Sequence, residues 1–307
     1  MKIDATICIC TYKRPQMLRS LLLGLNEQRD ESGGYVFDVN VVDNDRFKTA
    51  RGVTEEVSGK VEYGLRYFCE EEKNIALCRN TAVKNAVGEF VVFIDDDEFP
   101  DVNWLRLLID ICKEQKADGV LGPVLPFYET AAPRWLKRSG LCDRKRLKTF
   151  TFMKEPSLMR TGNVLLRRSL FTQGLFFDKR FGLCGGEDSD FFARALLKGY
   201  QFVWCDEAKV YEHVPVERCS AGYHVKRAFL RGALNARRSK KLLSRPVLKS
   251  AAAVSAYSLM MPFLLLSGRH HFMRYLVKSC DHWGRLLGVF GIEPVKDRSF
   301  MESAKDV

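Results

Sequence analysis

The sequence lacks the features that mark several classes of protein. Its opening, MKIDATICIC, turns polar before the apolar stretch of about 7–15 residues that a secretory signal needs, so we expect the catalytic part to stay in the cytoplasm. Ten cysteines in 307 residues are too sparse and scattered for a disulfide framework, and we expect reduced thiols. The Cys8-x-Cys10 pair alternates with isoleucines and has no zinc-site spacing, which favours packing in a core.

The charged residues are unevenly distributed along a chain whose 46% apolar content can bury a large core. The formal net charge of +11 comes from one region. Residues 224–285 contain 13 Lys/Arg and a single acid, whereas the rest of the chain has 36 Lys/Arg and 37 Asp/Glu. We therefore expect the C-terminal region to meet phosphate groups of a lipid, a nucleic acid or an anionic substrate.

The first 124 residues alternate short apolar runs with helical patterns, which indicates βαβ units and a mostly parallel sheet flanked by helices. We expect strands near 4–10, 37–43, 62–69, 89–95 and 118–124, with helices at about 15–29, 46–58, 74–86 and 102–116. In such α/β sheets the ligand binds beyond the carboxyl ends of the strands. The residues that follow each apolar run are therefore the candidates for a site.

The middle of the chain is less regular. Residues 125–156 are rich in Pro, Lys and Arg and suggest a long excursion over the sheet. Regular structure resumes at the segment NVLLRRSL, and a helix is expected from Glu187 to a stop at Gly199. Strands at 201–205 and 208–213 follow, and the last third of the chain has a helical pattern.

The strongest chemical signal lies at the end of one strand. In the segment FVVFIDDDEFP, four apolar residues, Val91 to Ile94, run directly into Asp95, Asp96, Asp97 and Glu98. Like charges so close repel one another, unless a hard divalent cation such as Mg²⁺ or Mn²⁺ compensates them through oxygen coordination. A solvated loop that caps the helix after Asp101 is the alternative, since acids are favoured at a helix N-terminus. Three successive strand-terminal acids exceed what a cap requires, so we predict a metal site.

A second acidic group, Gly185-Gly186-Glu187-Asp188-Ser189-Asp190, lies at the start of an expected helix. Its glycines let a ligand approach the backbone closely, and Glu187 or Asp188 fits a general base. An acidic first helical turn would explain this group if it stood alone. Together with the first acidic group, it favours a catalytic role.

These motifs resemble those of the family 2 glycosyltransferases with the GT-A fold, over about residues 3–215. In that family a Thr-Tyr-x-Arg-Pro turn helps to seat the nucleotide, an acid after the second strand reads the base or ribose, an Arg in an Asn-led element approaches the diphosphate, and an Asp-x-Asp motif binds metal. The matching residues here are Thr11, Tyr12, Arg14, Asp43, Asn74, Arg79, Asp95, Asp96 and Asp97. The resemblance implies that Asp97 is the best metal ligand, with Asp95 as a further ligand and with Asp95 and Asp96 near the ribose and sugar.

The acceptor-side motif of the family is a Glu-Asp pair, which corresponds to Glu187-Asp188, and Asp188 matches the position of the catalytic base. His213, in VYEHVP, resembles a His that lies near the diphosphate or metal in many GT-A enzymes, so it is a candidate metal ligand. The segment before VLLRRS resembles the acceptor-side strand of the family, where Asn163 is expected to contact the donor sugar.

Two features depart from the family pattern. Glu98 follows the metal motif where Asp is commoner, and no Gln-x-x-Arg-Trp follows the Glu-Asp pair. Processive polysaccharide synthases match that last motif closely, so its absence favours the addition of a single sugar.

The resemblance implies an α/β, GT-A-like fold and inverting transfer of a sugar from a nucleoside-diphosphate sugar, with UDP as the expected nucleotide and Mn²⁺ or Mg²⁺ as cofactor. The acceptor would be a saccharide or a lipid-linked saccharide. We predict a catalytic domain over 1–220, with a nucleotide-binding half at 1–124 and an acceptor half at 125–220, followed by a basic helical region at 221–307.

The C-terminal region contains an uncharged apolar segment at 250–266. Its 17 residues include three serines and a proline and fall short of the length of about 20 for a confident membrane span, so we expect a buried or membrane-dipping helix. Phe272, Leu276, Trp283 and Leu287 then recur at helical spacing among Lys and Arg, as does Phe290. Such a basic amphipathic helix suits an anionic membrane surface, and the alternative is a helix packed on the catalytic domain.

The membrane interpretation predicts peripheral contact with the cytoplasmic face of the inner membrane and a lipid-linked acceptor, as in bacterial surface-polysaccharide assembly. Two other functions remain open. A nucleotidyltransferase would usually have a Gly-rich phosphate-binding loop, but the turn at 11–15 has no glycine. A non-catalytic protein that binds nucleic acid or phosphate would explain the basic region, but no RNP-like or zinc motif accompanies it, so we expect no nucleic-acid partner.

Overall fold

The computed structural model describes residues 2–28, 34–129, 132–183, 185–237, 244–292 and 295. The chain forms two compact units. The first comprises Met1–Leu125 and Arg144–His213, and the second comprises Pro126–Asp143 and Val214–Val307. Residues 126–143 thus group with the C-terminal helices, whereas the sequence assigned them to the acceptor half of a domain at 1–220. The functional division of the chain stays a prediction.

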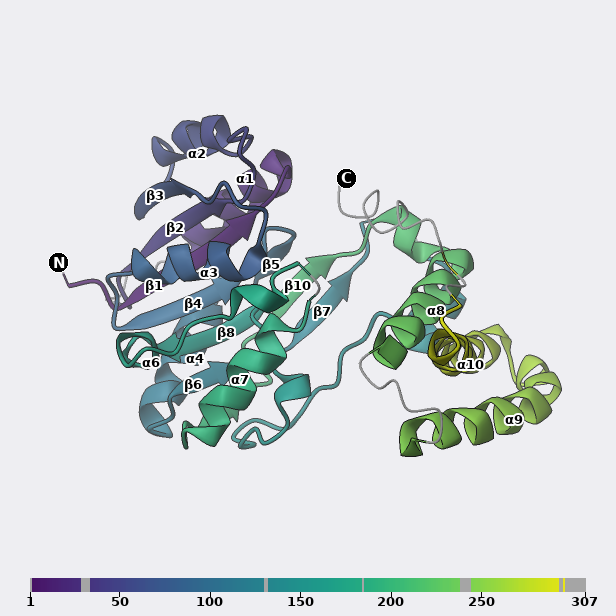
Figure 1. Cartoon of the computed structure of the whole chain (residues 1–307). Helices are drawn as coiled ribbons and strands as arrows, with labels where there is room; N and C mark the ends of the chain where they lie inside the picture. The colour runs from purple at the N-terminus through teal and green to yellow at the C-terminus, as the bar shows by residue number, and fades with distance from the viewer. Residues whose placement is uncertain are drawn as a thin grey trace. The chain divides into compact units, whose positions relative to one another are not determined.

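A seven-stranded sheet forms the centre of the first unit, in the order β3-β2-β1-β4-β8-β6-β9, and Figure 1 labels these strands except β9. Its strands are β1 (Ala5–Thr11), β2 (Phe37–Asp43), β3 (Gly64–Cys69), β4 (Phe90–Ile94), β6 (Gly119–Leu121), β8 (Asn163–Arg167) and β9 (Phe202–Trp204). Neighbouring strands are parallel except at β8, which runs antiparallel to β4 and β6. The mostly parallel α/β sheet expected from the sequence is confirmed.

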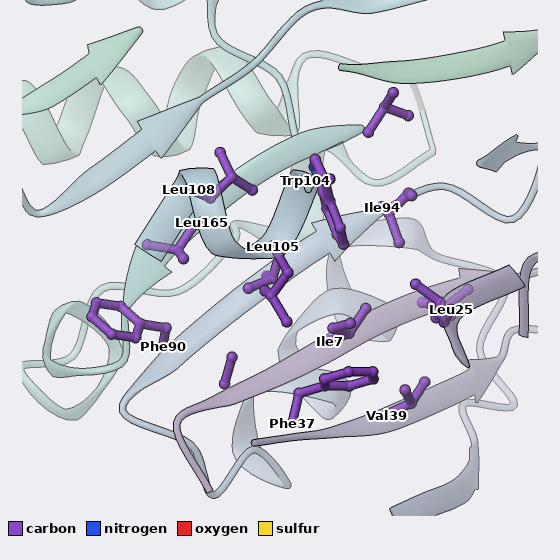
Figure 2. Close-up of a cluster of buried hydrophobic side chains, with 14 of the residues drawn as sticks. Ile7, Leu25, Phe37, Val39, Phe90, Ile94, Trp104, Leu105, Leu108 and Leu165 are labelled. Atoms are coloured by element: carbon purple, nitrogen blue, oxygen red, sulfur yellow. The ribbon is translucent and has the colours of Figure 1, made fainter. Parts of the chain in front are cut away.

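Helices cover both faces of this sheet because both faces are apolar. Ile7 and Ile9 of β1 pack in one cluster with side chains from α1, α2 and α4, while Cys8 packs in a second cluster with side chains from α3, α6 and α7. Figure 2 shows Trp104 and Leu105 of α4 in the first cluster, together with Ile7. The helices are α1 (Pro15–Gly24), α2 (Arg51–Ser58), α3 (Ile75–Lys84), α4 (Trp104–Glu114), α6 (Ser169–Thr172) and α7 (Glu187–Leu197).

The strand expected at 118–124 is divided in two. β6 ends at Leu121, and β7 (Val124–Phe127) joins a separate three-stranded sheet with β10 (Val210–His213) and β5 (Glu98–Pro100). Gly122 lies at the division, where a Cβ would be 2.3 Å from the Ala208 carbonyl oxygen. Only glycine permits this approach, which accounts for the residue at the break between β6 and β7. The sequence pattern showed the apolar run but not this break.

The second unit consists of helices: α5 (Arg134–Ser139), α8 (Ala221–Arg237), α9 (Arg245–Leu266) and α10 (Arg269–Val289). α10 contacts both α8 and α9 (Figure 1). A Cβ at Gly284 would lie 2.2 Å from the Phe229 carbonyl oxygen, and one at Gly232 would lie 2.0 Å from the Asp281 carbonyl oxygen. These glycines therefore allow the backbones of α8 and α10 to pack at close range. The expected helical C-terminal region is confirmed.

The apolar segment at 250–266 is helical, but it is not the buried helix that was one of the two expectations. Only Ser250 and Val254 of α9 are buried among the described residues. Its length and composition would suffice for a membrane span. α10 has the expected helical form, with Met273 and Val277 buried and with Trp283 exposed.

A buried histidine should make the second unit sensitive to acid. The ring of His224 lies 6.3 Å from the ring of Trp135, and burial lowers the pKa of His224 to about 4. In the unfolded chain this histidine has a pKa of about 6.5, so between pH ~6.5 and 4 it is protonated there but neutral in the folded state. The contribution of His224 to stability is therefore fully present above pH ~6.5 and is lost as the pH falls towards 4. We expect the free energy of unfolding to fall by about 2 kcal/mol at pH 5 from this group alone.

Urea unfolding followed by tryptophan fluorescence at pH 7.5 and pH 5 measures this loss. The His224→Phe variant keeps a ring of similar size and does not titrate, so its stability should depend less on pH than that of the wild type. The same loss of stability in both proteins would contradict the prediction.

Candidate active site

The acids that follow β4 meet the turn that follows β1, because these two parallel strands are neighbours in the sheet. The Thr11 hydroxyl donates to Asp96 Oδ2 over 2.7 Å. Arg14 Nη1 lies 2.8 Å from Asp96 Oδ1 and 2.9 Å from Asp97 Oδ2. The structure thus brings together four of the residues predicted to bind the donor or metal, and the guanidinium of Arg14 neutralises part of their charge.

The acidic cluster at 95–98 carries more negative charge than its neighbours compensate. Burial raises the pKa of Asp95 to about 7, against the attraction of Arg79 and with the repulsion of Asp97 added. Burial also raises the pKa of Asp96 to about 6, although Arg14 works in the opposite direction. Glu98 is 2% exposed, and burial raises its pKa well above the ordinary value. A further positive charge at this cluster would therefore be favourable.

The donor set of this cluster fits a hard divalent cation that is shared with a substrate. The described residues contain no ready-made group of three or more His, Cys, Asp and Glu side chains arranged to hold a metal. Mg²⁺ is usually bound by one or two carboxylates plus the phosphates of a substrate. Asp95 and Asp97 would supply the carboxylates of such a set. The backbone N–H of His213 donates to the Asp97 carbonyl oxygen over 3.0 Å, so this predicted ligand lies beside Asp97.

Arg79 connects the two acidic groups that the sequence singled out. It lies on α3, whose first turn is capped by Asn74, and it is 6% exposed. Its Nη1 atom donates to Glu187 Oε1 over 2.7 Å and to Asp188 Oδ1 over 2.8 Å. Burial opposes its charge, but Asp188, Asp95 and Glu187 outweigh burial and raise the pKa of Arg79. The guanidinium is thus a permanent cation between donor-side and acceptor-side acids.

The first turn of α7 presents Asp188 to this cation. Gly185 and Gly186, with φ of +77° and +102°, lead the chain into the helix through a backbone conformation that favours glycine. Asp188 Oδ1 accepts from the Thr161 hydroxyl over 3.1 Å, and its Oδ2 accepts from the Thr161 N–H over 3.3 Å. The carboxylate is therefore held from both sides, by Arg79 and by Thr161.

The turn before β8 joins the two sides of the site. β8 pairs antiparallel with β4, so that Asn163 lies opposite Ile94 and the turn at 161–162 lies beside the acids. A Cβ at Gly162 would be 2.8 Å from Glu98 Oε1 and 3.1 Å from Asp95 Oδ2. Because Thr161 bonds to Asp188 and the adjacent Gly162 has no side chain to separate it from Asp95, the two acidic groups belong to one site.

Three predicted site residues use their side chains in hydrogen bonds to neighbouring segments of the protein. Asp43 is fully buried and accepts from the Asp45 and Ala50 amides and from the Tyr67 hydroxyl, which shapes the turn after β2. Asn74 accepts from two amides at the start of α3 and donates to the Lys179 carbonyl. The contacts of these residues with the nucleotide stay predictions.

Asn163 is the third such residue. Its amide nitrogen donates to the Pro123 and Ala208 carbonyls, and its oxygen accepts from Trp104 Nε1 over 2.8 Å. The side chain is 2% exposed, so a contact with the donor sugar would require these bonds to break. In this structure Asn163 instead ties β8 to α4 and to the segments that precede β7 and β10. Tyr12, another predicted site residue, is half-buried. The Lys73 ammonium lies 4.5 Å from the centre of its ring.

Two residues that the sequence motifs did not single out also belong to the site. Thr161 holds Asp188, and the only sequence signal was its place in a segment that resembled the acceptor-side strand. Arg144 pairs with Glu212, and despite the cost of burial Glu212, Glu98 and Asp95 raise its pKa. Arg144 lies in the stretch expected to be an irregular excursion, where no pattern distinguishes it from neighbouring cations.

Comparison with known proteins agrees with this geometry. The model of the family named Glycosyl transferase family 2 matches residues 6–174. The succinoglycan biosynthesis protein ExoM of Rhizobium meliloti is 30% identical over 94% of both chains. Among solved structures, S. aureus TarS 1–349 in complex with UDP has a TM-score of 0.56 at 17% identity and covers 94% of this chain and 91% of its own. The Pyrobaculum calidifontis mannosyltransferase PcManGT, solved with GDP-Man and Mn²⁺, has a TM-score of 0.59 at 17% identity, over 93% and 88%.

The family model covers more than half of the chain, and the ExoM match extends through nearly all of it. These matches rule out the two alternatives drawn from the sequence, the nucleotidyltransferase and the non-catalytic nucleic-acid or phosphate-binding protein. The solved structures support the GT-A fold independently. The chain therefore belongs to glycosyl transferase family 2 and is a glycosyltransferase with the GT-A fold.

Proposed function

We propose that the protein is an inverting, divalent-cation-dependent glycosyltransferase that moves one sugar from a nucleoside-diphosphate sugar to a saccharide acceptor. The observation that carries this proposal is the position of Arg79, which contacts Asp188 and is attracted by Asp95. Acids suited to a metal-bound diphosphate are thus close to an acid suited to deprotonate an acceptor.

In the proposed step, Asp188 takes the proton of an acceptor hydroxyl while the hydroxyl oxygen attacks the anomeric carbon of the donor. The bond between that carbon and the phosphate oxygen breaks, and the nucleoside diphosphate leaves with the electron pair. Attack from the side opposite the leaving group inverts the anomeric configuration. The Asp188 side chain is 16% exposed, so a hydroxyl has access to it.

The leaving diphosphate needs positive charge, which a bound divalent cation supplies as a Lewis acid. Asp97 and Asp95 would hold this cation, with His213 beside them. Arg14 now neutralises Asp96 and Asp97, and it is the charge that the cation would replace. Glu187 shares Arg79 with Asp188 and so holds the guanidinium in place at the acceptor carboxylate.

The nucleotide would occupy the carboxyl ends of β1 and β2. In this arrangement the ring of Tyr12 offers a stacking surface for the base, and the turn ordered by Asp43 borders the ribose. UDP is the expected nucleotide. TarS in complex with UDP and with UDP-GlcNAc supports this choice, and PcManGT with GDP-Man and Mn²⁺ supports a divalent cation.

The acceptor is proposed to be a lipid-linked saccharide, and the second unit would bring the enzyme to the cytoplasmic face of the inner membrane. The charge of the C-terminal region supports this location, since anionic lipids attract Lys and Arg. The similarity to a succinoglycan biosynthesis protein supports polysaccharide assembly as the context. The absence of the Gln-x-x-Arg-Trp motif supports addition of one sugar at a time.

A donor screen tests the proposed function. UDP-, GDP- and dTDP-sugars are offered with Mn²⁺, Mg²⁺ or EDTA, and thermal stabilisation and slow donor hydrolysis are measured. We expect a UDP-sugar to stabilise the protein only with the cation, by about 2.7 kcal/mol at a concentration 100 times its dissociation constant. Equal stabilisation in EDTA would contradict the cation dependence, and no response to any sugar nucleotide would contradict the donor class.

A further inference from the structure

From Ala251 to Leu266 the helix α9 is uncharged and mostly apolar, and it is nevertheless exposed. From Ser250 to Gly268 it and the following turn carry no charged residue. The exposed fractions are 76% for Leu259, 73% for Phe263 and 88% for Leu266. A helix that is apolar all round normally lies inside a protein or a membrane. α10 packs along it, and Ser250 and Val254 are the residues of α9 that are buried among those described.

The pairing of α9 with α10 decides how this helix meets a membrane. The ring of Tyr257 lies 5.6 Å from that of Tyr275 and 5.9 Å from that of His282, and Ser250 Oγ is 3.0 Å from His282 Nδ1. The two helices therefore run antiparallel, joined by a short turn at Ser267–Gly268.

A perpendicular crossing by α9 would draw part of α10 into the hydrocarbon. Arg274 and Lys278 flank Tyr275 on α10, so they lie level with the middle of α9. Each would cost about 2.5–3.5 kcal/mol at the centre of a bilayer. α9 is long enough to span, but the charges of α10 favour an orientation in which both helices lie in the plane of the membrane surface.

The antiparallel pair of α9 and α10, here called the α9–α10 hairpin, carries a positive charge that indicates the kind of surface it would contact. Residues 245–289 contain one acid, Asp281, which pairs with Arg231 over 2.6 Å. Exposed cations lie at both ends of α9 and along α10, at Arg245, Lys249, Arg269, Arg274 and Lys278. Each Lys or Arg near an anionic leaflet contributes about 1 kcal/mol. A second copy of the chain would instead oppose like charges across a two-fold axis, because such an interface pairs the same surface patch with itself.

We propose that the α9–α10 hairpin lies flat on an anionic bilayer, with Leu259, Phe263 and Leu266 in the interfacial layer and Arg269 at the level of the lipid phosphates. This inference rests on the membrane location in the proposed function and is independent of the transfer chemistry. It assigns the membrane contact to the exposed side of α9, while α10 supplies cations.

Flotation of the full chain with vesicles tests the inference. The vesicles are phosphatidylcholine alone or phosphatidylcholine with 30% phosphatidylglycerol, and the variants are Leu266→Glu and Phe263→Glu. The matched control is Leu197→Glu, because Leu197 at the end of α7 is also 88% exposed. We expect binding to the anionic vesicles, weakened at least about tenfold in each α9 variant and unchanged in the control.

The alternatives give other results. Equal binding by Leu266→Glu and the wild type would overturn the assignment to α9. Self-association without vesicles that Leu266→Glu abolishes would identify a second copy as the occupant, and would also overturn it. Metal-dependent donor hydrolysis, measured in the same samples without lipid, should be the same in all variants. If the wild type hydrolyses the donor but binds no vesicle, the membrane inference is wrong and the transfer chemistry stands.

Discussion

Replacing Asp188 by Asn is expected to lower the rate of sugar transfer by about 10²–10⁴-fold, while donor binding is retained. The amide oxygen of Asn can still accept from Arg79 and from the Thr161 hydroxyl, and only the longer bond from the Thr161 N–H to Oδ2 is lost, so the first turn of α7 should keep its structure. It cannot take a proton from an acceptor hydroxyl, and that proton transfer is the proposed role of Asp188. The measurements are the rate of transfer at saturating donor and the dissociation constant of the donor with Mn²⁺.

Asp190→Asn is the matched control. Asp190 lies in the same turn of α7 and pairs with Arg194 over 2.7 Å in a partly exposed ion pair. The variant changes the charge and the helix N-terminus in the same way as Asp188→Asn, so its transfer rate should stay near that of the wild type. A transfer rate in Asp188→Asn equal to that in Asp190→Asn would contradict the assignment of the base.

Thr161 offers a second way to examine the same carboxylate. Thr161→Val removes the hydroxyl that donates to Asp188 Oδ1 and keeps the backbone N–H that donates to Oδ2. Loss of one hydrogen bond to a charged group corresponds to a rate decrease of about tenfold. We expect this decrease in kcat, with little change in the donor KM. Thr161→Ser restores the hydroxyl and should restore kcat. Failure of Ser to do so would mean that Thr161 acts through packing alone.

The sequence predicted the framework of the fold because local patterns determine it. The apolar runs at β1, β2 and β4 and the acids that follow β4 can be read without knowledge of any distant contact. The break at Gly122 was missed because the groups packed around it, such as the Ala208 carbonyl, come from segments distant in the sequence, in this case more than 80 residues away. Likewise, the apolar segment at 250–266 was correctly expected to be helical, but its exposure depends on which helices pack against it.

The candidate site was predictable as a set of residues and not as a set of contacts. Arg79 was expected to approach the donor diphosphate, and the structure adds that it bonds to Glu187 and Asp188 from a helix more than 100 residues away in sequence. Asn163 was expected at the donor sugar, but burial and three internal hydrogen bonds occupy its amide. A motif identifies which residue types are needed near a site, whereas the direction of each side chain depends on the partners that folding supplies.

Replacing Asp97 by Asn is expected to weaken Mn²⁺-dependent donor binding by at least about 10–100-fold, the loss typical even of residues that only support metal ligands. Asp97 adds to the repulsion that raises the pKa values of Asp95, Asp96 and Glu98. Removal of its charge should therefore leave the metal-free protein at least as stable as the wild type, although function is lost. Titration with Mn²⁺ and UDP-sugar, together with thermal unfolding in EDTA, measures both effects.

The control for this variant is Asp110→Asn, which removes a carboxylate from the exposed side of α4, where Asp110 accepts from the Tyr35 hydroxyl. It should leave metal-dependent donor binding unchanged. If Asp97→Asn retains the Mn²⁺ affinity of this control, Asp97 is not a metal ligand.

A variant of Arg14 can show whether Asp97 binds the metal or only maintains local structure. Arg14 Nη1 lies 2.9 Å from Asp97 Oδ2. A cation that binds Asp97 competes with this guanidinium for the same oxygen. Arg14→Gln should therefore strengthen Mn²⁺ binding in the absence of donor, and it should weaken binding of the nucleotide, whose diphosphate loses a positive partner. Effects of opposite sign in one variant cannot come from a general loss of structure, whereas a fall in both affinities would mean that Arg14 serves only to hold the acidic cluster together.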